Sequence, residues 1–354
     1  MTFPAAITGE YLIRDFRFGN GEILGELRQC YLTLGEPQYN GHGSIGNAVL
    51  LLHNTTGTSN DWVSPGLGDY LFNAGQPLDA SRFYIIMPDS IGFGSSSKPS
   101  DGLRARFPQY RYTDVVEAQM RLLTEHFRIT HLRLILGLSM GGMLTWLWGT
   151  MYPKFMDALV PIACQPAAMS GRNWIQRRMA IEAIRNDPGW KRGDYDSQPV
   201  HYTLTPIGAI FTQSVVRIQE MASTRETADA LYRQMVERAR EGDANNRLYQ
   251  LEASMNYDPT PALEQVVAPV LAINFADDEL NPPELGLLEG ALSRVRDGRG
   301  IVLPATPESR GHYSAQQASC WAQHVAAFMR EKITDNNIPA DNAIIASVQP
   351  IPSP

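Results

Sequence analysis

The fold of this chain can be inferred outward from Leu134-Ile135-Leu136-Gly137-Leu138-Ser139-Met140-Gly141-Gly142-Met143. A run of β-favouring apolar residues ends in the pattern Gly-x-Ser-x-Gly, and the chain passes at once into an apolar segment typical of a buried helix. A strand, a sharp turn that carries serine, and a helix are the parts of a nucleophile elbow. Glycines on both sides of the serine leave room for the turn, and the helix N-terminus offers free N–H groups to an oxyanion. Ser139 is therefore the candidate nucleophile.

The length and composition of the chain limit the classes of protein that it can form. It has 354 residues, of which 44% are hydrophobic and 19% are charged, so it can bury a large core in one elaborated domain or in a domain with an insertion. The net charge of −7 argues against nucleic acid or an anionic membrane surface as a partner. No apolar run approaches the roughly 20 residues that a membrane-spanning helix needs. We expect a soluble protein.

The cysteines and the N-terminus indicate the compartment. The three cysteines are odd in number, far apart and without a C-x-x-C pattern: Cys30, Cys164 and Cys320. This usage fits reduced thiols better than a disulfide framework, and the first residues show neither the basic nor the apolar region of a signal peptide. We therefore expect a cytoplasmic protein. No cluster of histidine, cysteine and aspartate has metal-ligand spacing, so neither a metal nor a cofactor is expected.

Apolar runs that alternate with amphipathic segments predict the architecture. Residues 11–34 indicate antiparallel strands, and continuous apolar runs predict buried strands at 48–52 and 83–87. Further strands are expected at 134–138, 158–162, 270–275 and 300–304. Helices are expected at 114–127, with Thr113 as the N-cap, at 140–152 and at 314–331. Strands that alternate with helices form a mostly parallel central sheet with flanking helices. The fold class is therefore α/β.

The alternation stops after Cys164. Residues 165–261 contain no strand-like run, but they contain amphipathic stretches at 174–185, 207–221 and 226–241. An all-helical insertion behind the elbow suits a cap over a site. We expect a core of residues 1–164 and 262–333, a helical cap of residues 165–261, and a mobile tail of residues 334–354, which is rich in proline and alanine and has no periodicity.

A base and an acid follow the serine along the chain. Serine is a poor nucleophile until a base takes its proton, and the base needs an anion to orient it. His312 follows the last strand and is the candidate base, whereas Asp277 and Asp278 follow the strand before it and are both candidates for the acid. The order serine, aspartate, histidine, with each residue at the end of a strand, is that of α/β-hydrolases.

The loop that follows the strand 48–52 supplies further candidates. His53-Asn54-Thr55-Thr56-Gly57-Thr58 is a stretch of small residues that can direct a backbone N–H at a reacting carbonyl oxygen. Thr55 is the candidate donor, in partnership with the N–H of Met140. His53 is a candidate for lining the substrate site, although it precedes the serine.

Several motifs together resemble the homoserine O-acetyltransferase family of α/β-hydrolase-fold proteins. They are Ser139-Met140-Gly141-Gly142-Met143 with Tyr152-Pro153, the segment from Asn173 to Tyr195, Asp278-Glu279-Leu280-Asn281-Pro282, and Gly311-His312. The resemblance implies the α/β-hydrolase fold, the triad Ser139, Asp278 and His312, and Thr55 and Met140 as oxyanion donors. It also implies that Arg178 matches the arginine that holds the amino-acid carboxylate in transacetylases, and that the chain forms a homodimer through cap helices.

The sequence departs from that family at two loops. Transacetylases carry Gly-Gly-Cys-x-Gly-Ser-Thr-Gly-Pro after the second buried strand, where this chain has Ser90-Ile91-Gly92-Phe93-Gly94-Ser95-Ser96-Ser97-Lys98-Pro99, and the family's His-Ala-Leu-Thr-Gly is here His53-Asn54-Thr55-Thr56-Gly57. We therefore expect an esterase-like enzyme that hydrolyses a small acyl compound through an acyl-enzyme. The alternatives are O-acyl transfer from acyl-CoA, as co-substrate, to a hydroxyl amino acid, and a ligand-binding protein with a vestigial triad.

Overall fold

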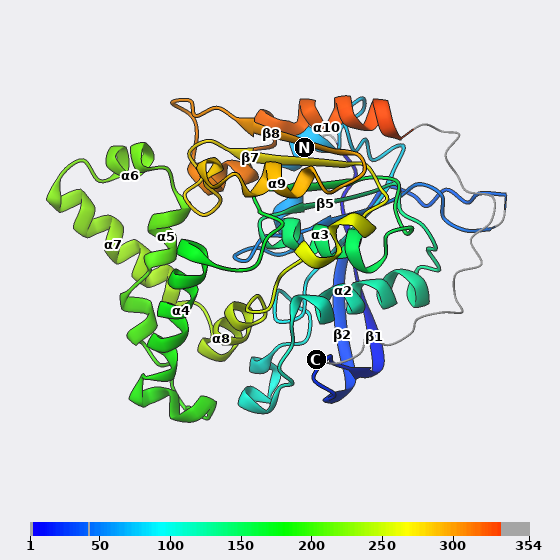
Figure 1. The fold of residues 1–354 in the computed structure, drawn as a ribbon. Helices are drawn as coiled ribbons and strands as arrows, with labels where there is room; N and C mark the ends of the chain where they lie inside the picture. The colour runs from blue at the N-terminus through cyan, green and yellow to red at the C-terminus, as the bar shows by residue number, and fades with distance from the viewer. Residues whose placement is uncertain (1–2, 42, 334–354) are drawn as a thin grey trace.

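An eight-stranded sheet runs through the computed structural model, which describes residues 3–41 and 43–333 (Figure 1). Its strand order is β1-β2-β4-β3-β5-β6-β7-β8. The strands are β1 (Ile7–Arg17), β2 (Ile23–Leu34), β3 (Ala48–Leu52), β4 (Tyr84–Pro88), β5 (Leu134–Leu138), β6 (Leu159–Ile162), β7 (Val270–Phe275) and β8 (Gly298–Leu303). β1 and β2 form the predicted antiparallel pair, β2 also pairs antiparallel with β4, and the other neighbours are parallel. The mostly parallel central sheet is thereby confirmed.

Helices cover both faces of the sheet. α2 (Tyr112–Arg121), α3 (Met140–Met151) and α9 (Leu287–Leu292) pack on one face, and α1 (Gly68–Leu71) and α10 (Ala318–Lys332) pack on the other. β3 shows how one strand serves both layers, because Leu50 packs among the first group and Val49 and Leu51 among the second. Successive side chains of a strand point to opposite faces, so a strand buried on both sides must be apolar throughout.

The helix predicted at 114–127 differs in detail. α2 begins at Tyr112, and the residue at its N-cap is Arg111, so Thr113 as the cap was wrong. The carboxylate of Asp114 explains the earlier start, because it accepts the Arg111 backbone N–H at 2.7 Å from within the first turn. α2 ends at Arg121 and continues as one π-helical turn over Leu122–His126.

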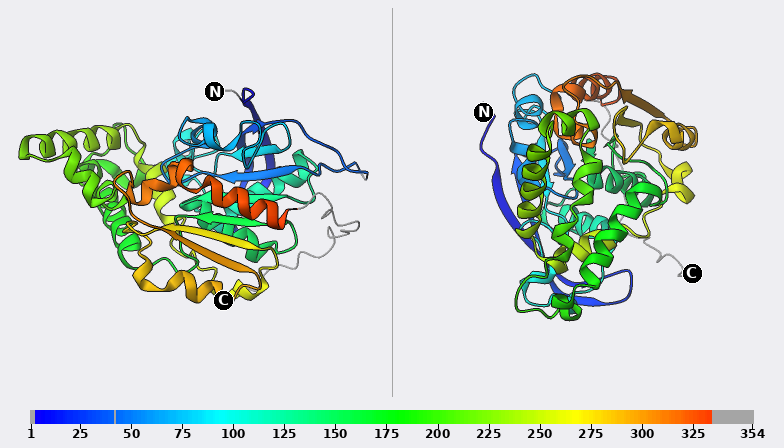
Figure 2. Two further views of the ribbon diagram at one scale, coloured as in Figure 1. Left: turned by 90° about the horizontal axis from the view of Figure 1, so that it is seen from above. Right: turned by 90° about the vertical axis from the view of Figure 1, so that its left-hand side faces the viewer.

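Five α-helices lie between β6 and β7, and the described residues of this segment form no strand. They are α4 (Gly171–Arg185), α5 (Ile207–Thr212), α6 (Val215–Met221), α7 (Arg225–Arg240) and α8 (Ala244–Glu252). Figures 1 and 2 show α4 to α7 at one side of the sheet, with α6 and α7 furthest from it. The single helix predicted at 207–221 is two helices, because Gln213 is extended and the Ser214 side chain caps α6 by accepting the Arg217 N–H.

The segment between α5 and α6 meets the core. The Ser214 hydroxyl donates to the Ser309 carbonyl oxygen at 3.3 Å, and the backbone of Gln213 and Ser214 lies against Gly311.

The tail expected at 334–354 lies outside the described residues. Among the described helices, none combines the length and the apolar character needed to cross a membrane.

Candidate active site

Ser139 occupies a strained turn between β5 and α3. Its φ is 54° and its ψ is −109°, in a region that residues other than glycine rarely adopt. The turn is held by the Ser139 N–H, which donates to the carbonyl oxygen of Ile162 at 2.8 Å. A Cβ atom at position 141 would overlap the carbonyl oxygens of Leu52 and His53, so only glycine lets α3 start this close to β3.

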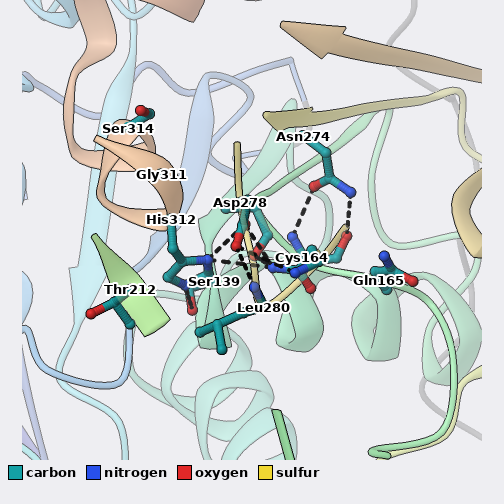
Figure 3. A network of polar contacts seen from close by, with 12 residues as sticks. Ser139, Cys164, Gln165, Thr212, Asn274, Asp278, Leu280, Gly311, His312 and Ser314 are labelled. Atoms are coloured by element: carbon teal, nitrogen blue, oxygen red, sulfur yellow. Dashed lines mark hydrogen bonds and ion pairs between the residues drawn. The ribbon is translucent and has the colours of Figure 1, made fainter. Parts of the chain in front are cut away.

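Three side chains from the ends of three strands form one hydrogen-bonded relay (Figure 3). The Ser139 Oγ lies 2.7 Å from His312 Nε2, and His312 Nδ1 lies 2.8 Å from Asp278 Oδ2. Because the carboxylate can only accept, Nδ1 carries the proton and Nε2 is free to accept the serine proton. The structure therefore brings Ser139, His312 and Asp278 together in the geometry of a serine nucleophile, a base and an orienting acid.

The carboxylate of Asp278 is buried but well satisfied. Oδ1 accepts the Leu280 N–H at 2.9 Å, and Oδ2 accepts the side-chain amide of Asn281 at 2.9 Å as well as the His312 ring. Burial by itself raises the pKa of Asp278, but the His312 charge and these hydrogen bonds outweigh it and hold the pKa below its ordinary value. Asp278 is therefore ionised at neutral pH and can orient and stabilise a charged His312.

The neighbouring Asp277 has a different position. Its Oδ2 accepts the backbone N–H of Gly311 at 3.0 Å, directly before His312. Gly311 has a φ of 61°, and a side chain there would collide with the backbone of Ser214 and Gln213. Of the two adjacent acids, Asp278 touches His312 and Asp277 fixes the loop that carries it.

The two candidate oxyanion donors lie at neighbouring strand ends. Met140 is the first residue of α3, so its N–H has no intrahelical acceptor. Thr55 follows β3, which pairs with β5 up to Leu52 and Gly137. In the described part of the chain, the Thr55 hydroxyl oxygen is buried and has no hydrogen-bond partner. Met140 therefore directly follows Ser139, and Thr55 lies three residues beyond the end of the strand next to β5.

We expected His53 to line the substrate site, and the structure shows that the backbone occupies both of its ring nitrogens. It is buried, its Nδ1 lies 2.8 Å from the Asn54 carbonyl oxygen, and its Nε2 lies 3.0 Å from the Ser90 nitrogen. A carbonyl must receive a proton and an N–H must give one, so the ring is the neutral Nδ1–H form. Burial lowers the pKa of His53 and keeps it neutral. The ring ties the loop of Thr55 to the loop after β4.

Arg178 is also placed differently from what the resemblance implied. It points outward from α4, about half exposed, and pairs with Glu182 one turn along the helix at 2.6 Å. The adjacent Arg177 is buried, and its Nε donates to the Asn173 side chain at 3.0 Å. The helix periodicity explains the difference, because successive residues lie about 100° apart around the axis. Arg177 is the arginine of this segment that faces the interior.

Asn281 was not identified from the sequence. Its side-chain amide donates both to Asp278 Oδ2 and, at 3.0 Å, to the carbonyl oxygen of Ala163 after β6. The signal available was an amide three residues after the acid, a spacing at which a short side chain can return to the same turn. Within the described residues, no group of three histidine, cysteine, aspartate or glutamate side chains could hold a metal ion.

Comparison with known proteins gives the family. A model of the alpha/beta hydrolase fold matches residues 47–296. The chain belongs to the α/β-hydrolase fold family. The predicted fold class is confirmed, as is the resemblance to homoserine O-acetyltransferases, because the homoserine O-acetyltransferase of Geotalea uraniireducens is 30% identical over 313 residues, covering 76% of this chain and 81% of that protein.

Other relatives of this α/β-hydrolase carry different names. A probable acyltransferase of Methanothermobacter thermautotrophicus is 29% identical over 279 residues, covering 78% of this chain and 84% of that protein. Among solved structures, homoserine O-acetyltransferase from Bacillus anthracis has a TM-score of 0.81 at 20% identity and covers 94% of this chain and 99% of that one. Esterase E22 has a TM-score of 0.79 at 19% identity and covers 92% and 100%. At these identities the solved structures show a shared fold.

The buried His53 predicts an acid-sensitive stability. Because its folded pKa lies below the ordinary value of 6.5, the unfolded chain binds more protons, so stability falls as pH drops below about 6.5. One such group changes the free energy of unfolding by at most about 1.4 kcal/mol per pH unit. His53→Gln can replace both hydrogen bonds but does not titrate. We expect the free energy of unfolding, measured by urea denaturation at pH 8 and pH 5, to fall less in the variant. Equal losses in both proteins would contradict the assignment.

Proposed function

We propose that this α/β-hydrolase cleaves a carboxylic ester or related small acyl compound through a seryl acyl-enzyme. The observation that carries the proposal is the relay from Ser139 Oγ through His312 to Asp278, with contacts of 2.7 and 2.8 Å. His312 Nε2 takes the hydroxyl proton as Oγ bonds to the acyl carbon. It then gives that proton to the departing alcohol oxygen when the ester C–O bond breaks. A water or a second alcohol releases the acyl group by the same steps in reverse.

The negative charge of the tetrahedral intermediate needs donors that are already in place. The N–H groups of Met140 and Thr55 are the proposed pair, since Met140 opens α3 beside the serine and Thr55 lies in the loop that follows the adjacent strand β3. One such donor contributes roughly 3 kcal/mol to the transition state. The positive end of α3 acts in the same direction.

Hydrolysis is the preferred outcome for two reasons. The loop after β4 departs from the transacetylase pattern, and serine hydroxyls fasten it to β2: Ser97 Oγ accepts the Arg28 N–H and Ser96 Oγ accepts the Cys30 N–H, both at 2.9 Å. The unpartnered hydroxyl of Thr55, where the family pattern has leucine, offers a polar contact to a water molecule. A transferase must instead keep water from its acyl-enzyme. Esterase E22 shares the fold, which is compatible with this choice.

O-acyl transfer to a hydroxyl compound is the second candidate. The curated relatives favour it, since those near 30% identity are named homoserine O-acetyltransferase or probable acyltransferase. Under this candidate acyl-CoA is the acyl donor, that is, a co-substrate; neither candidate uses a cofactor. The step that forms the acyl-enzyme is common to both. A ligand-binding protein with a vestigial triad is disfavoured by the intact relay.

We also propose a homodimer that forms through the cap helices and resides in the cytoplasm. Apolar side chains on α5 and α6 are open to solvent, with exposed fractions of 52% for Ile210, 66% for Val215 and 60% for Val216. A second copy that packs on this surface would bury them. The free thiols of Cys30, Cys164 and Cys320 support a reducing compartment.

The two adjacent acids are expected to differ in their effect on catalysis. Asp278→Asn removes the anion that orients His312, so kcat should fall roughly 10⁴-fold. Asp277→Asn keeps an oxygen that can accept the Gly311 N–H, so kcat should fall much less, by no more than about tenfold. Steady-state rates on p-nitrophenyl acetate, with the fold checked by circular dichroism, make the comparison. Equal losses would contradict the separate roles.

The fate of the acyl-enzyme distinguishes the two candidate reactions. Mixing with p-nitrophenyl acetate should give a burst of p-nitrophenol and a mass increase at Ser139, and Ser139→Ala should give neither. We expect the acyl group to be lost in buffer at a rate that homoserine or serine does not change. An acyl-enzyme that persists in buffer and is discharged by the amino acid would show a transferase. Absence of any acyl-enzyme would favour the ligand-binding alternative.

The dimer makes a prediction of its own. Val215→Glu places a charge in the apolar surface of α5 and α6 and should shift sedimentation equilibrium at micromolar concentration from dimer to monomer. Ile7→Glu is the matched control, because Ile7 is 63% exposed but lies on β1, away from the cap. A wild-type chain that sediments as a monomer, or equal dissociation by both variants, would contradict the cap interface.

A further inference from the structure

The chain leaves β6 through a conformation that is unusual for alanine. Ala163 has a φ of 54°, in the left-handed region that residues with a Cβ atom adopt at a cost in free energy. The Ile162 carbonyl accepts the Ser139 N–H, and the Ala163 N–H donates to the Ile273 carbonyl, both at 2.8 Å. Residues 162–164 form the β6 turn. Strain of this kind persists only where the surroundings hold it, so the contacts of the β6 turn are informative.

Two buried asparagines hold the β6 turn. Asn274, on β7, uses both ends of its side-chain amide on the Cys164 backbone (Figure 3), because Oδ1 accepts the N–H at 3.1 Å and Nδ2 donates to the carbonyl at 3.2 Å. Asn281 Nδ2 donates to the Ala163 carbonyl at 3.0 Å. The two residues are only 3% and 2% exposed. Loss of a buried hydrogen-bond partner costs free energy, so both asparagines stabilise the turn.

Asn281 differs from Asn274 because it also contacts the acid. The same Nδ2 donates to Asp278 Oδ2 at 2.9 Å, and a side-chain amide has two hydrogens, so this bond and the bond to Ala163 can form together. Oδ2 is the oxygen that accepts from His312 Nδ1 at 2.8 Å. Asn281 Nδ2 and His312 Nδ1 lie 3.4 Å apart, and since both donate to Oδ2, they contact each other without a hydrogen bond. Asn281 therefore fixes the oxygen that orients the base.

The β6 turn also packs against the elbow that carries Ser139. Besides accepting the Ser139 N–H, it places Cys164 against the first turn of α3, where a Cβ atom at Gly142 would come within 2.6 Å of the Cys164 Sγ. The backbone that holds the nucleophile is thus the backbone to which Asn281 is bonded. Through its second hydrogen bond, Asn281 joins Asp278 to that backbone.

We propose that Asn281 is a positioning residue for Asp278. It holds the acid at the separation from Ser139 that His312 bridges, with contacts of 2.7 and 2.8 Å. Asn281 acts on the reacting atoms through Asp278. The inference rests on the proposed function for its effect on the rate, but not for its effect on the hydrogen bond between His312 and Asp278. The alternative is that Asn281, like Asn274, only stabilises the β6 turn.

A double-mutant cycle separates these two roles. It follows the acylation of Ser139 by p-nitrophenyl acetate, with enzyme in excess so that slow variants can be measured. Asn281→Leu should lower the saturating rate roughly 10- to 100-fold, with the half-saturating concentration changed less than about twofold, because the acid is displaced and the ester site is not. In Asp278→Asn protein, which has no anion to position, the same substitution should change the rate less than about twofold. A residue that only stabilises the turn would lower both rates by the same factor. That result, or an unchanged rate without the Asp278 substitution, overturns the proposal.

Two further variants complete the kinetic test. Asn47→Leu is the matched control, because Asn47 is also buried and its Nδ2 donates to the carbonyls of Glu36 and Arg82, both at 3.0 Å. Asn47 directly precedes β3, at the end of the strand away from the elbow, so its loss should reduce stability and leave the rate per folded molecule unchanged. Asn281→Asp keeps the size of the side chain and replaces Asn281→Leu if that variant does not fold. Its carboxylate cannot donate and repels Asp278, so the rate should fall at least as far. Equal losses with Asn47→Leu and the Asn281 variants would overturn the proposal.

The hydrogen bond between His312 and Asp278 tests the proposal without chemistry. The His312 Nδ1–H gives a downfield proton resonance, which is identified by its absence in His312→Gln protein. Asn281→Leu should shift this resonance upfield and speed its exchange with water, whereas Asn47→Leu should do neither. A resonance that is unchanged in Asn281→Leu overturns the proposal. A shifted resonance in a protein that reacts with no ester would support the proposal and refute only the proposed function.

Discussion

The close packing of α3 against the ends of β3 and β5 is the constraint on which the site depends. The backbone of Gly141 lies so near the carbonyl of Leu52, and that of Gly137 so near the carbonyl of Gly141, that a Cβ atom at either position would overlap a carbonyl oxygen. The turn between them forces Ser139 to a φ of 54°, a conformation that costs on the order of 1–3 kcal/mol. The same turn holds the serine hydroxyl and the first free N–H of α3 at one point. The strain is thus a consequence of bringing the proposed nucleophile and the proposed oxyanion donor together.

Two buried charged side chains of the structure, Asp278 and Arg177, differ in how completely their polar atoms are hydrogen-bonded. The core keeps Asp278 ionised although it is buried, because its oxygens receive the His312 ring, the Asn281 amide and the Leu280 N–H. Asn281 is itself fixed by the Ala163 carbonyl, so the acid cannot turn away from the base. In the helical segment after β6, by contrast, Arg177 is buried and its Nη1 has no hydrogen-bond partner among the described residues. A satisfied charge can orient a neighbour, whereas an unsatisfied one is suited to bind something that arrives later.

The sequence was most informative where local chemistry determines structure. Five- and six-residue apolar runs identified the buried strands, since a strand covered on both faces leaves no polar position. The order of Ser139 and His312 along the chain identified both, but adjacent acids cannot be separated by order, and the choice of Asp278 came from the family resemblance. The break at Gln213 was missed because the amphipathic pattern continues through it.

Two predictions depended on tertiary contacts, which the local sequence does not show. His53 was expected in the substrate site because of its place after β3, yet its ring is occupied by the Asn54 carbonyl and the Ser90 N–H. Arg178 and Arg177 are adjacent and chemically identical, so only the orientation of α4 decides which one is buried.

The helical segment between β6 and β7 and the proposed base His312 cannot be treated as independent parts. The loop of His312 is fixed from the core side by Asp277, which accepts the Gly311 N–H, and from the cap side by Ser214, whose hydroxyl reaches the Ser309 carbonyl. Gly311 lies between these two contacts with no space for a side chain. A displacement of the segment between α5 and α6 would therefore move the base as well as the wall of the site.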